Sequence, residues 1–216
     1  MTGVVVDLGV IEYGEAWQIQ KDLVAKRTAD LIPDTLLILE HKHVITLGRK
    51  TTPENFKPQK VPVFQVERGG DATYHGPGQL VGYPIVKLGD HDVRKHVRTV
   101  EGSLIAAVGH FGVEAERMEG HPGIWVRERK LASIGVAVTD WVTFHGFALN
   151  VNTDLSYFEL IRPCGLDPSS MTSMQKVAGR GFDIAEVKKQ VVREYTEAKG
   201  EEFVWRDAAQ PLLGKR

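Results

Sequence analysis

Arg68-Gly69-Gly70-Asp71-Ala72-Thr73-Tyr74-His75-Gly76-Pro77-Gly78-Gln79 is the stretch of this chain that carries most information about its fold. It holds four glycines and a proline among charged, aromatic and histidine side chains. Glycine permits unusual backbone angles and close approach of a ligand, and the polar side chains between the glycines could hold that ligand. The G-x-x-x-x-G-K-[ST] spacing of a phosphate-binding loop is absent. The stretch therefore predicts either a tight turn between strands or a ligand-binding loop.

Two other segments contain residues with chemical potential. The run Lys130-Leu131-Ala132-Ser133-Ile134-Gly135 places a lysine at the head of an apolar strand, which is either a solvated strand end or a functional position. In Arg162-Pro163-Cys164-Gly165-Leu166, the proline fixes one backbone angle and the glycine gives the thiol little steric cover. This pattern predicts a loop. Its cysteine is either a small buried hydrophobe or a reactive thiol.

The composition excludes several classes of protein. The 216 residues include 27 Lys and Arg against 28 Asp and Glu, a balance that does not suit a strongly basic nucleic-acid-binding domain. No apolar run approaches the ~18 residues of a transmembrane helix, and the segment Met1 to Val10 lacks the pattern of a secretory signal. A single cysteine cannot form an internal disulfide, so we expect a cytoplasmic protein.

Hydrophobic periodicity predicts one α+β domain over residues 1–216, with a mixed β-sheet and flanking helices. Residues from about 181 to 216 could form a C-terminal helical appendage. The expected strands are Gly3–Leu8, Thr35–Glu40, Val44–Leu47, Val61–Glu67, Gln79–Leu88, Gly123–Glu128, Lys130–Val138, Trp141–Val151 and Glu202–Trp205. The expected helices are one around Trp17–Val24 that Pro33 closes, Val93–Phe111, and Phe182–Ala198 with Asp183 as its cap. We expect Thr35–Glu40 and Val44–Leu47 to pair with each other around His41-Lys42-His43.

Four ordered segments resemble the lipoyl(octanoyl) transferase family, within the fold group of the biotin and lipoate protein ligases. They are RGGDATYHGPGQLVGYPIV from Arg68, KLASIGVAV from Lys130, FHGFALNV from Phe144 and RPCGL from Arg162. Weaker similarity begins near Leu39 and continues to about Met174. The resemblance implies a mixed sheet with helices on its outer side that forms an acyl-binding channel.

The same resemblance implies roles for individual residues. Cys164 matches the acyl-thioester nucleophile, and Lys130 matches the lysine that pairs with this cysteine and lowers its pKa. A free cysteine is only a few per cent thiolate at neutral pH, so a neighbouring ammonium would help it to react. Three segments match the substrate-binding residues: Arg68, Gly69, Gly70, Asp71, Ala72, Thr73, Tyr74 and His75; Ser133, Ile134 and Gly135; and Gly146, Phe147 and Ala148.

The implied reaction moves an octanoyl or lipoyl group from acyl carrier protein, through a cysteine thioester, to a lysine of another protein. The implied acceptors are lipoyl domains of 2-oxoacid dehydrogenase and glycine cleavage proteins, with no nucleic-acid or membrane partner. His41 and His43 have no further ligand at zinc spacing beside them, so we expect no metal and no cofactor. Three alternatives stay open: an ATP-dependent lipoate ligase, a non-catalytic acyl-binding domain, and a cysteine hydrolase with His75 or His145 as its base.

Overall fold

The computed structural model describes residues 2–52, 61–161 and 168–207. Within them, eight strands form a large sheet and three strands form a small one. The large sheet has the order β11 (Phe203–Arg206), β1 (Gly3–Ile11), β2 (Thr35–His41), β6 (Gln79–Ile85), β10 (Val142–Asn150), β9 (Arg129–Thr139), β8 (His121–Val126) and β7 (Glu116–Met118). The small sheet has the order β4 (Val63–Gln65), β3 (Val44–Leu47) and β5 (Thr73–His75).

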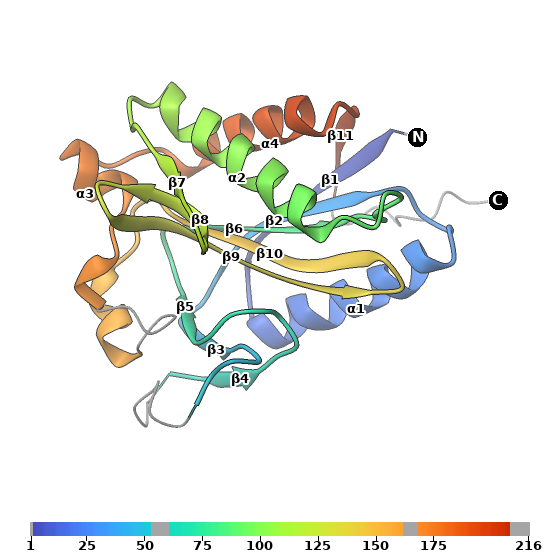
Figure 1. Cartoon of the computed structure of the whole chain (residues 1–216), viewed down its shortest axis with the longest axis horizontal. Coiled ribbons are helices and arrows are strands. Elements are labelled where there is room, and N and C mark those ends of the chain that lie inside the picture. The colour runs from blue at the N-terminus through green and yellow to red at the C-terminus, as the bar shows by residue number, and fades with distance from the viewer. Residues whose placement is uncertain (1, 53–60, 162–167, 208–216) are drawn as a thin grey trace.

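The large sheet is mixed, as the sequence predicts. Strand β1 pairs in parallel with β2 and β11, whereas the remaining neighbours in this sheet are antiparallel. Helices α2 (Val93–His110) and α4 (Ile184–Lys199) cover one face, and α1 (Tyr13–Thr28) lies on the other together with the small sheet (Figure 1). The central strands are therefore buried on both sides.

Side-chain alternation along β2 explains this two-sided core. Leu36 and Ile38 belong to the cluster that includes α2 and α4, whereas Leu37 and Leu39 belong to the cluster that includes α1. Successive side chains of a strand point to opposite faces. A continuous apolar run is therefore what a strand covered on both faces requires.

The predicted pairing of Thr35–Glu40 with Val44–Leu47 is wrong. Strand β2 lies between β1 and β6 in the large sheet, and β3 lies between β4 and β5 in the small one. The intervening residues lack the Asn-Gly or Asp-Gly pair that a tight hairpin prefers. Moreover, His41 is buried and hydrogen-bonded to Ile11 and Tyr83, which holds the end of β2 inside the large sheet. The chain then crosses to the small sheet.

The three predicted helices are present in the structure, and their ends differ from the predicted ones by up to a few residues. Helix α2 begins after Asp92, whose carboxylate accepts from the Lys95 amide at 2.9 Å. Helix α4 begins after Asp183, which caps it by accepting from the Ala185 amide at 2.8 Å. Pro33 does not close α1, because that helix ends at Thr28 and the left-handed Asp30 follows.

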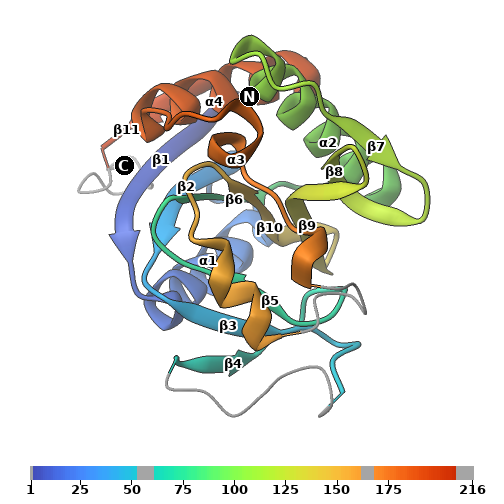
Figure 2. The ribbon, with the colours of Figure 1, turned by 90° about the vertical axis from the view of Figure 1, so that its left-hand side faces the viewer.

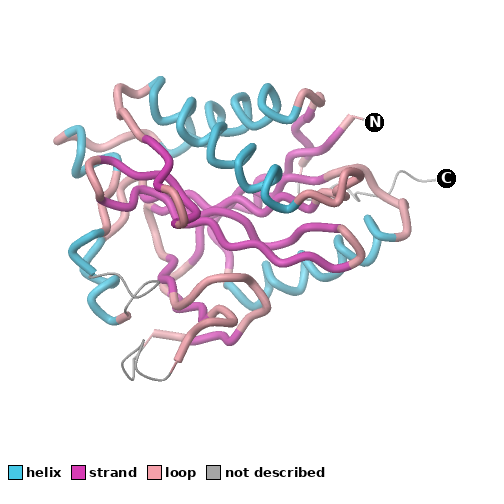
Figure 3. The backbone as a smooth tube through the Cα atoms, in the orientation of Figure 1, coloured by secondary structure: helices cyan, strands magenta, loops and turns pink. Residues whose placement is uncertain are grey.

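The C-terminal elements join the main body of the fold. Helix α4 packs beside α2, and β11 pairs with β1 over the register Gly3–Phe203 to Val6–Arg206. Strands predicted at Val61–Glu67 and Gln79–Leu88 are shorter in the structure, where they are β4 and β6. The short helices η2 (Leu155–Leu160), η4 (Pro168–Ser170) and α3 (Met174–Ala178) lie at one end of the large sheet (Figure 2). Figure 3 shows the long helices on the two faces of the large sheet and the short helices at this end of it.

Candidate functional site

A cavity lies where the glycine-rich segment crosses strands β9 and β10. Its empty volume is about 560 Å³, a figure that includes space open to solvent. Its lining includes the predicted residues 68–73, His75, Lys130, 133–135 and 146–148. The fold thus gathers three segments that are separate in the chain.

Two predicted site residues are not placed in this cavity. Tyr74 is fully buried with its ring against Tyr157, and its hydroxyl is hydrogen-bonded to His43 Nδ1 at 2.8 Å. It is therefore a core residue of the small sheet, and the cavity lining does not include it. Cys164 lies outside the described residues.

The glycines bring the main chain of the loop onto strand β9. The Gly69 amide donates to the Val136 carbonyl at 3.0 Å. A Cβ atom at Gly135 would lie 3.0 Å from the Gly69 oxygen and 3.2 Å from Arg68 Cδ. Glycine at position 135 therefore permits the close approach of loop and strand that forms this wall of the cavity.

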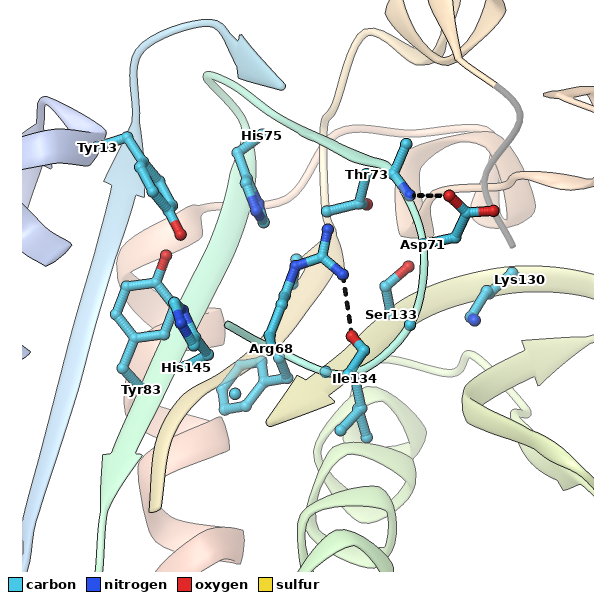
Figure 4. A pocket seen from close by; sticks show the side chains of 17 residues that line it. Tyr13, Arg68, Asp71, Thr73, His75, Tyr83, Lys130, Ser133, Ile134 and His145 are labelled. Carbon is cyan, nitrogen blue, oxygen red and sulfur yellow. Dashed lines mark hydrogen bonds between the residues drawn. The ribbon is translucent and has the colours of Figure 1, made fainter. Parts of the chain in front are cut away.

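Arg68 anchors the loop from within the cavity. Its Nη2 donates to the Thr46 carbonyl at 2.8 Å and to Thr46 Oγ1 at 3.0 Å. Its Nη1 donates to the Gly69 carbonyl at 3.1 Å (Figure 4). These bonds hold the guanidinium in the middle of the site. Beside it, Thr73 Oγ1 is buried and has no hydrogen-bond partner in the described part of the chain.

His75 is held as a neutral side chain. Its Nδ1 is 2.8 Å from Gln79 Oε1, and its Nε2 is 3.5 Å from Thr46 Oγ1. Burial holds the pKa of His75 well below its ordinary value, with the Arg68 guanidinium acting in the same direction and the hydrogen bond to Gln79 opposing it. Both nitrogens are engaged with protein groups. This arrangement does not favour the hydrolase alternative in which His75 acts as a general base.

Tyr13, Tyr83 and His145 form the side of the cavity opposite to Lys130 and Asp71 (Figure 4). Burial lowers the pKa of His41, which lies behind Tyr83, to about 4, so this imidazole is neutral at pH 7. His41 Nδ1 donates to the Ile11 carbonyl at 3.0 Å, so Nε2 accepts from the Tyr83 hydroxyl at 2.7 Å. The Tyr83 hydroxyl oxygen can therefore still accept a hydrogen bond from a group in the cavity.

His145 has a left-handed backbone inside strand β10, with φ of 55°. Non-glycine residues adopt this conformation at a cost, and such strain concentrates at functional sites. Its amide donates to Gln20 Oε1 of α1 at 2.7 Å, which stabilises the bend. Burial lowers the pKa of His145 to about 4, with Arg68 acting in the same direction and Glu67 opposing it. The neutral imidazole faces Tyr83.

Lys130 is buried at the start of β9, and only 4% of it is exposed. Its Nζ lies 5.2 Å from the centroid of the Trp125 ring, a distance compatible with a cation–π contact. A Cβ atom at Gly123 would lie 2.8 Å from Lys130 Cε, so glycine at that position leaves room for the lysine stem. Lys130 is therefore a wall residue of the cavity and not a solvated strand end.

The sequence prediction missed Tyr13 and Tyr83 as cavity residues, and it named His145 only as a possible base of the hydrolase alternative. Tyr83 and His145 lie inside two of the quoted family segments, so a wider selection from those segments would have included them. Tyr13 lies outside these segments, and the sequence has no signal that marks it as a cavity residue. It reaches the cavity because α1 packs against the same face of the sheet.

The described residues contain no group of three or more His, Cys, Asp or Glu side chains that could hold a metal ion. Among the helices in the same residues, none has the length and apolar character needed to cross a membrane.

Comparisons with known proteins give consistent results. The model of the lipoyl protein ligase A/B catalytic domain family matches residues 12–196. The octanoyltransferase of Syntrophotalea carbinolica is 49% identical over 188 residues, which cover 86% of this chain and 89% of that protein. The octanoyltransferase of Geobacter sulfurreducens is 43% identical over 211 residues, which cover 96% of this chain and 90% of that protein.

Solved structures show the same fold at low sequence identity. A lipoate-protein ligase A bound with ATP has a TM-score of 0.77 and 16% identity, covering 97% of this chain and 90% of its own. A biotin protein ligase from Aquifex aeolicus has a TM-score of 0.54 and 13% identity, covering 93% and 70%.

Proposed function

The chain belongs to the lipoyl protein ligase A/B catalytic domain family, and on this premise we propose how its reaction proceeds. It is an octanoyltransferase of protein lipoylation, as its relatives of 42–49% identity over most of the chain are. We propose that the donor is octanoyl-acyl carrier protein. The proposed acceptors are lysines in the lipoyl domains of 2-oxoacid dehydrogenase and glycine cleavage proteins.

The proposed reaction has two acyl transfers. The Cys164 thiolate attacks the thioester carbonyl of the donor, a new C–S bond forms, and the carrier thiolate leaves. The acceptor amine then attacks the Cys164 thioester, an amide C–N bond forms, and the Cys164 thiolate is released. Exchange of one thioester for another is close to neutral in energy, so loading requires no nucleotide.

Lys130 is proposed to serve both transfers. In the first, its ammonium stabilises the thiolate by charge. In the second, the thiolate charge has gone, and an amine in a buried site loses its proton more easily. The Lys130 ammonium gives its proton to the departing carrier thiolate, and the neutral Lys130 amine then takes a proton from the acceptor ammonium as a general base, which frees the acceptor amine to attack. The proton that remains on the nitrogen is lost to solvent as the amide forms. Burial of Lys130 in the cavity wall supports this pair of roles.

The observation that carries the proposal is the cavity itself. It brings Lys130 together with residues of three family segments, and it combines backbone walls with apolar side chains such as Ile134 and Phe147. Each buried methylene of an acyl chain contributes about 0.8 kcal/mol, so such a wall suits a medium-length chain.

Intact-mass measurement tests the proposal. The wild-type protein incubated with octanoyl-acyl carrier protein and no nucleotide should gain the mass of one octanoyl group. Hydroxylamine should remove this group, and Cys164→Ala should not gain it. An unmodified wild-type mass during turnover would contradict the covalent route, and a requirement for ATP would favour a ligase mechanism.

A further inference from the structure

The main chain at Lys130 pairs with Trp125 of β8 on one side and is held by a segment distant in sequence on the other. The pairing of β9 with β10 extends only to Ala132, which lies opposite Leu149. Lys130 is thus beyond the last β10 partner. Its carbonyl accepts instead from the Thr172 amide at 2.9 Å, and a parallel bridge joins Lys130 to Met171. The position of residues 171 and 172 therefore affects the position of the lysine.

Asn150 holds Thr172 in turn. It is the last residue of β10, and its Nδ2 donates to the Thr172 carbonyl at 3.0 Å. Its Oδ1 accepts from Gln79 Nε2 at 2.9 Å. Gln79 and Asn150 lie opposite each other in the register of β6 and β10, and both are buried. Opposed side chains of antiparallel strands lie within contact distance.

Gln79 extends this chain of hydrogen bonds to the glycine-rich segment. Its Nε2 also donates to the Tyr74 carbonyl at 3.1 Å, and its Oε1 accepts from His75 Nδ1 at 2.8 Å. His75 Nε2 contacts Thr46 Oγ1, to which Arg68 donates. Along the whole path from Arg68 to the Thr172 carbonyl, each hydrogen bond pairs one donor with one acceptor. Buried networks whose members are all satisfied rigidify a site.

We propose that Gln79 and Asn150 are positioning residues, which set the main chain at Lys130 through Thr172 and thereby align the lysine with the reacting groups. Neither side chain lines the cavity, so both act without contact to the acyl chain. The inference rests on the proposed function of Lys130. It predicts that cutting the Asn150–Thr172 bond lowers kcat with little effect on substrate binding.

The test compares Asn150→Ala with Asn152→Ala in octanoyl transfer from acyl carrier protein. Asn152 makes a similar pair of hydrogen bonds, at 2.7 and 3.0 Å, but to the Phe182 backbone near α4. Misplacement of a catalytic group by about 1 Å costs on the order of a hundredfold. We therefore expect Asn150→Ala to lower kcat about ten- to a hundredfold with KM within about twofold. Asn152→Ala should keep the wild-type kcat at a similar loss of Tm.

Asn150→Asp provides a second readout. Its carboxylate still accepts from Gln79 but places an oxygen against the Thr172 carbonyl. Protonation restores a donor toward that carbonyl, and burial against the Thr172 carbonyl oxygen raises the pKa of such a carboxyl group. The kcat of this variant relative to wild type should therefore recover as the pH falls from 8 toward 5. Should Asn150→Ala fail to fold, this pH profile decides alone.

The outcomes distinguish a failure of the proposed function from a failure of the positioning role. A wild-type protein that transfers no octanoyl group refutes the proposed function. An active wild type with an unchanged kcat in Asn150→Ala, an equal loss in Asn152→Ala, or a flat pH ratio for Asn150→Asp overturns the positioning role alone.

Discussion

Lys130 is a lysine that the fold keeps almost fully out of solvent. Lysines are rarely buried unless partners or a function retain them, because the ammonium loses its hydration. Here the stem passes Gly123, the charge approaches the Trp125 ring, and Thr172 binds the main chain. These contacts together hold the lysine amine in the cavity wall. Lys130 is the proposed partner of Cys164, and the reactivity of the thiol tests this pairing.

Lys130→Ala should slow the alkylation of Cys164 by iodoacetamide at pH 7 about three- to tenfold, because loss of the cation lowers the thiolate fraction. Lys130→Arg retains the charge but cannot serve as a base, so it should keep much of the alkylation rate and lose transfer to the acceptor amine. Lys42→Ala is the control, since Lys42 is exposed and paired with Glu12. Equal alkylation rates in wild type and Lys130→Ala would show that the two residues do not interact.

Strand β10 carries the bend that turns His145 toward Tyr83, and helix α1 holds this bend. Gln20 is fully buried, and its Oε1 accepts from the His145 amide across 125 residues of sequence. The residues that follow, 146–148, line the cavity. The contact between one helix and one strand therefore determines the shape of the wall.

Gln20→Ala should leave the His145 amide without its partner and cost about 1–3 kcal/mol in the free energy of unfolding. We also expect a higher KM for the octanoyl donor, because the wall at residues 146–148 loses its support. Gln18→Ala is the matched control, since Gln18 is exposed on the same helix and its side-chain amide donates to Asp22. Urea unfolding and steady-state kinetics measure the two effects. A Gln20→Ala protein as stable as Gln18→Ala would contradict this role of α1.

The whole molecule buries several histidines in the neutral form. Burial lowers the pKa values of His41, His96 and His145 to about 4, and it holds that of His75 well below the ordinary value. These four side chains come from β2, α2, β10 and β5. Because all four are buried in the neutral form, the free energy of unfolding depends on pH in mild acid.

The free energy of unfolding should fall as the pH decreases from 6.5 toward 4. In this window the unfolded chain binds protons at these histidines and the folded chain does not, so stability rises with pH. Each histidine contributes up to about 1.4 kcal/mol per pH unit. Urea titrations at pH 5, 6, 7 and 8 measure this slope. His96→Phe should reduce it, whereas a slope unchanged by this substitution would show that His96 does not contribute.

The sequence by itself determined the family and most of the long elements, whereas the short elements β5, β7, η2, η4 and α3 were not predicted. Helix α2 follows from apolar residues three or four positions apart, and strand β10 from a run of apolar residues after Trp141. These signals are local, because a helix or strand presents one face at a fixed period. The cavity residues at 68–73, 133–135 and 146–148 were predicted through the family segments, whose order along the chain is itself sequence information.

Only the tertiary structure decided which elements meet. It placed β2 and β3 in different sheets and brought Tyr13 to the cavity. It also set residues 171 and 172 beside the start of β9 on the edge where the pairing with β10 has ended, while β8 pairs with the other edge. The buried path from Arg68 to Thr172 joins residues from β3, β5, β6 and β10. A periodic pattern specifies that a face is buried but not what covers it. Long-range pairing and packing make that choice, because they depend on how all the elements fit together.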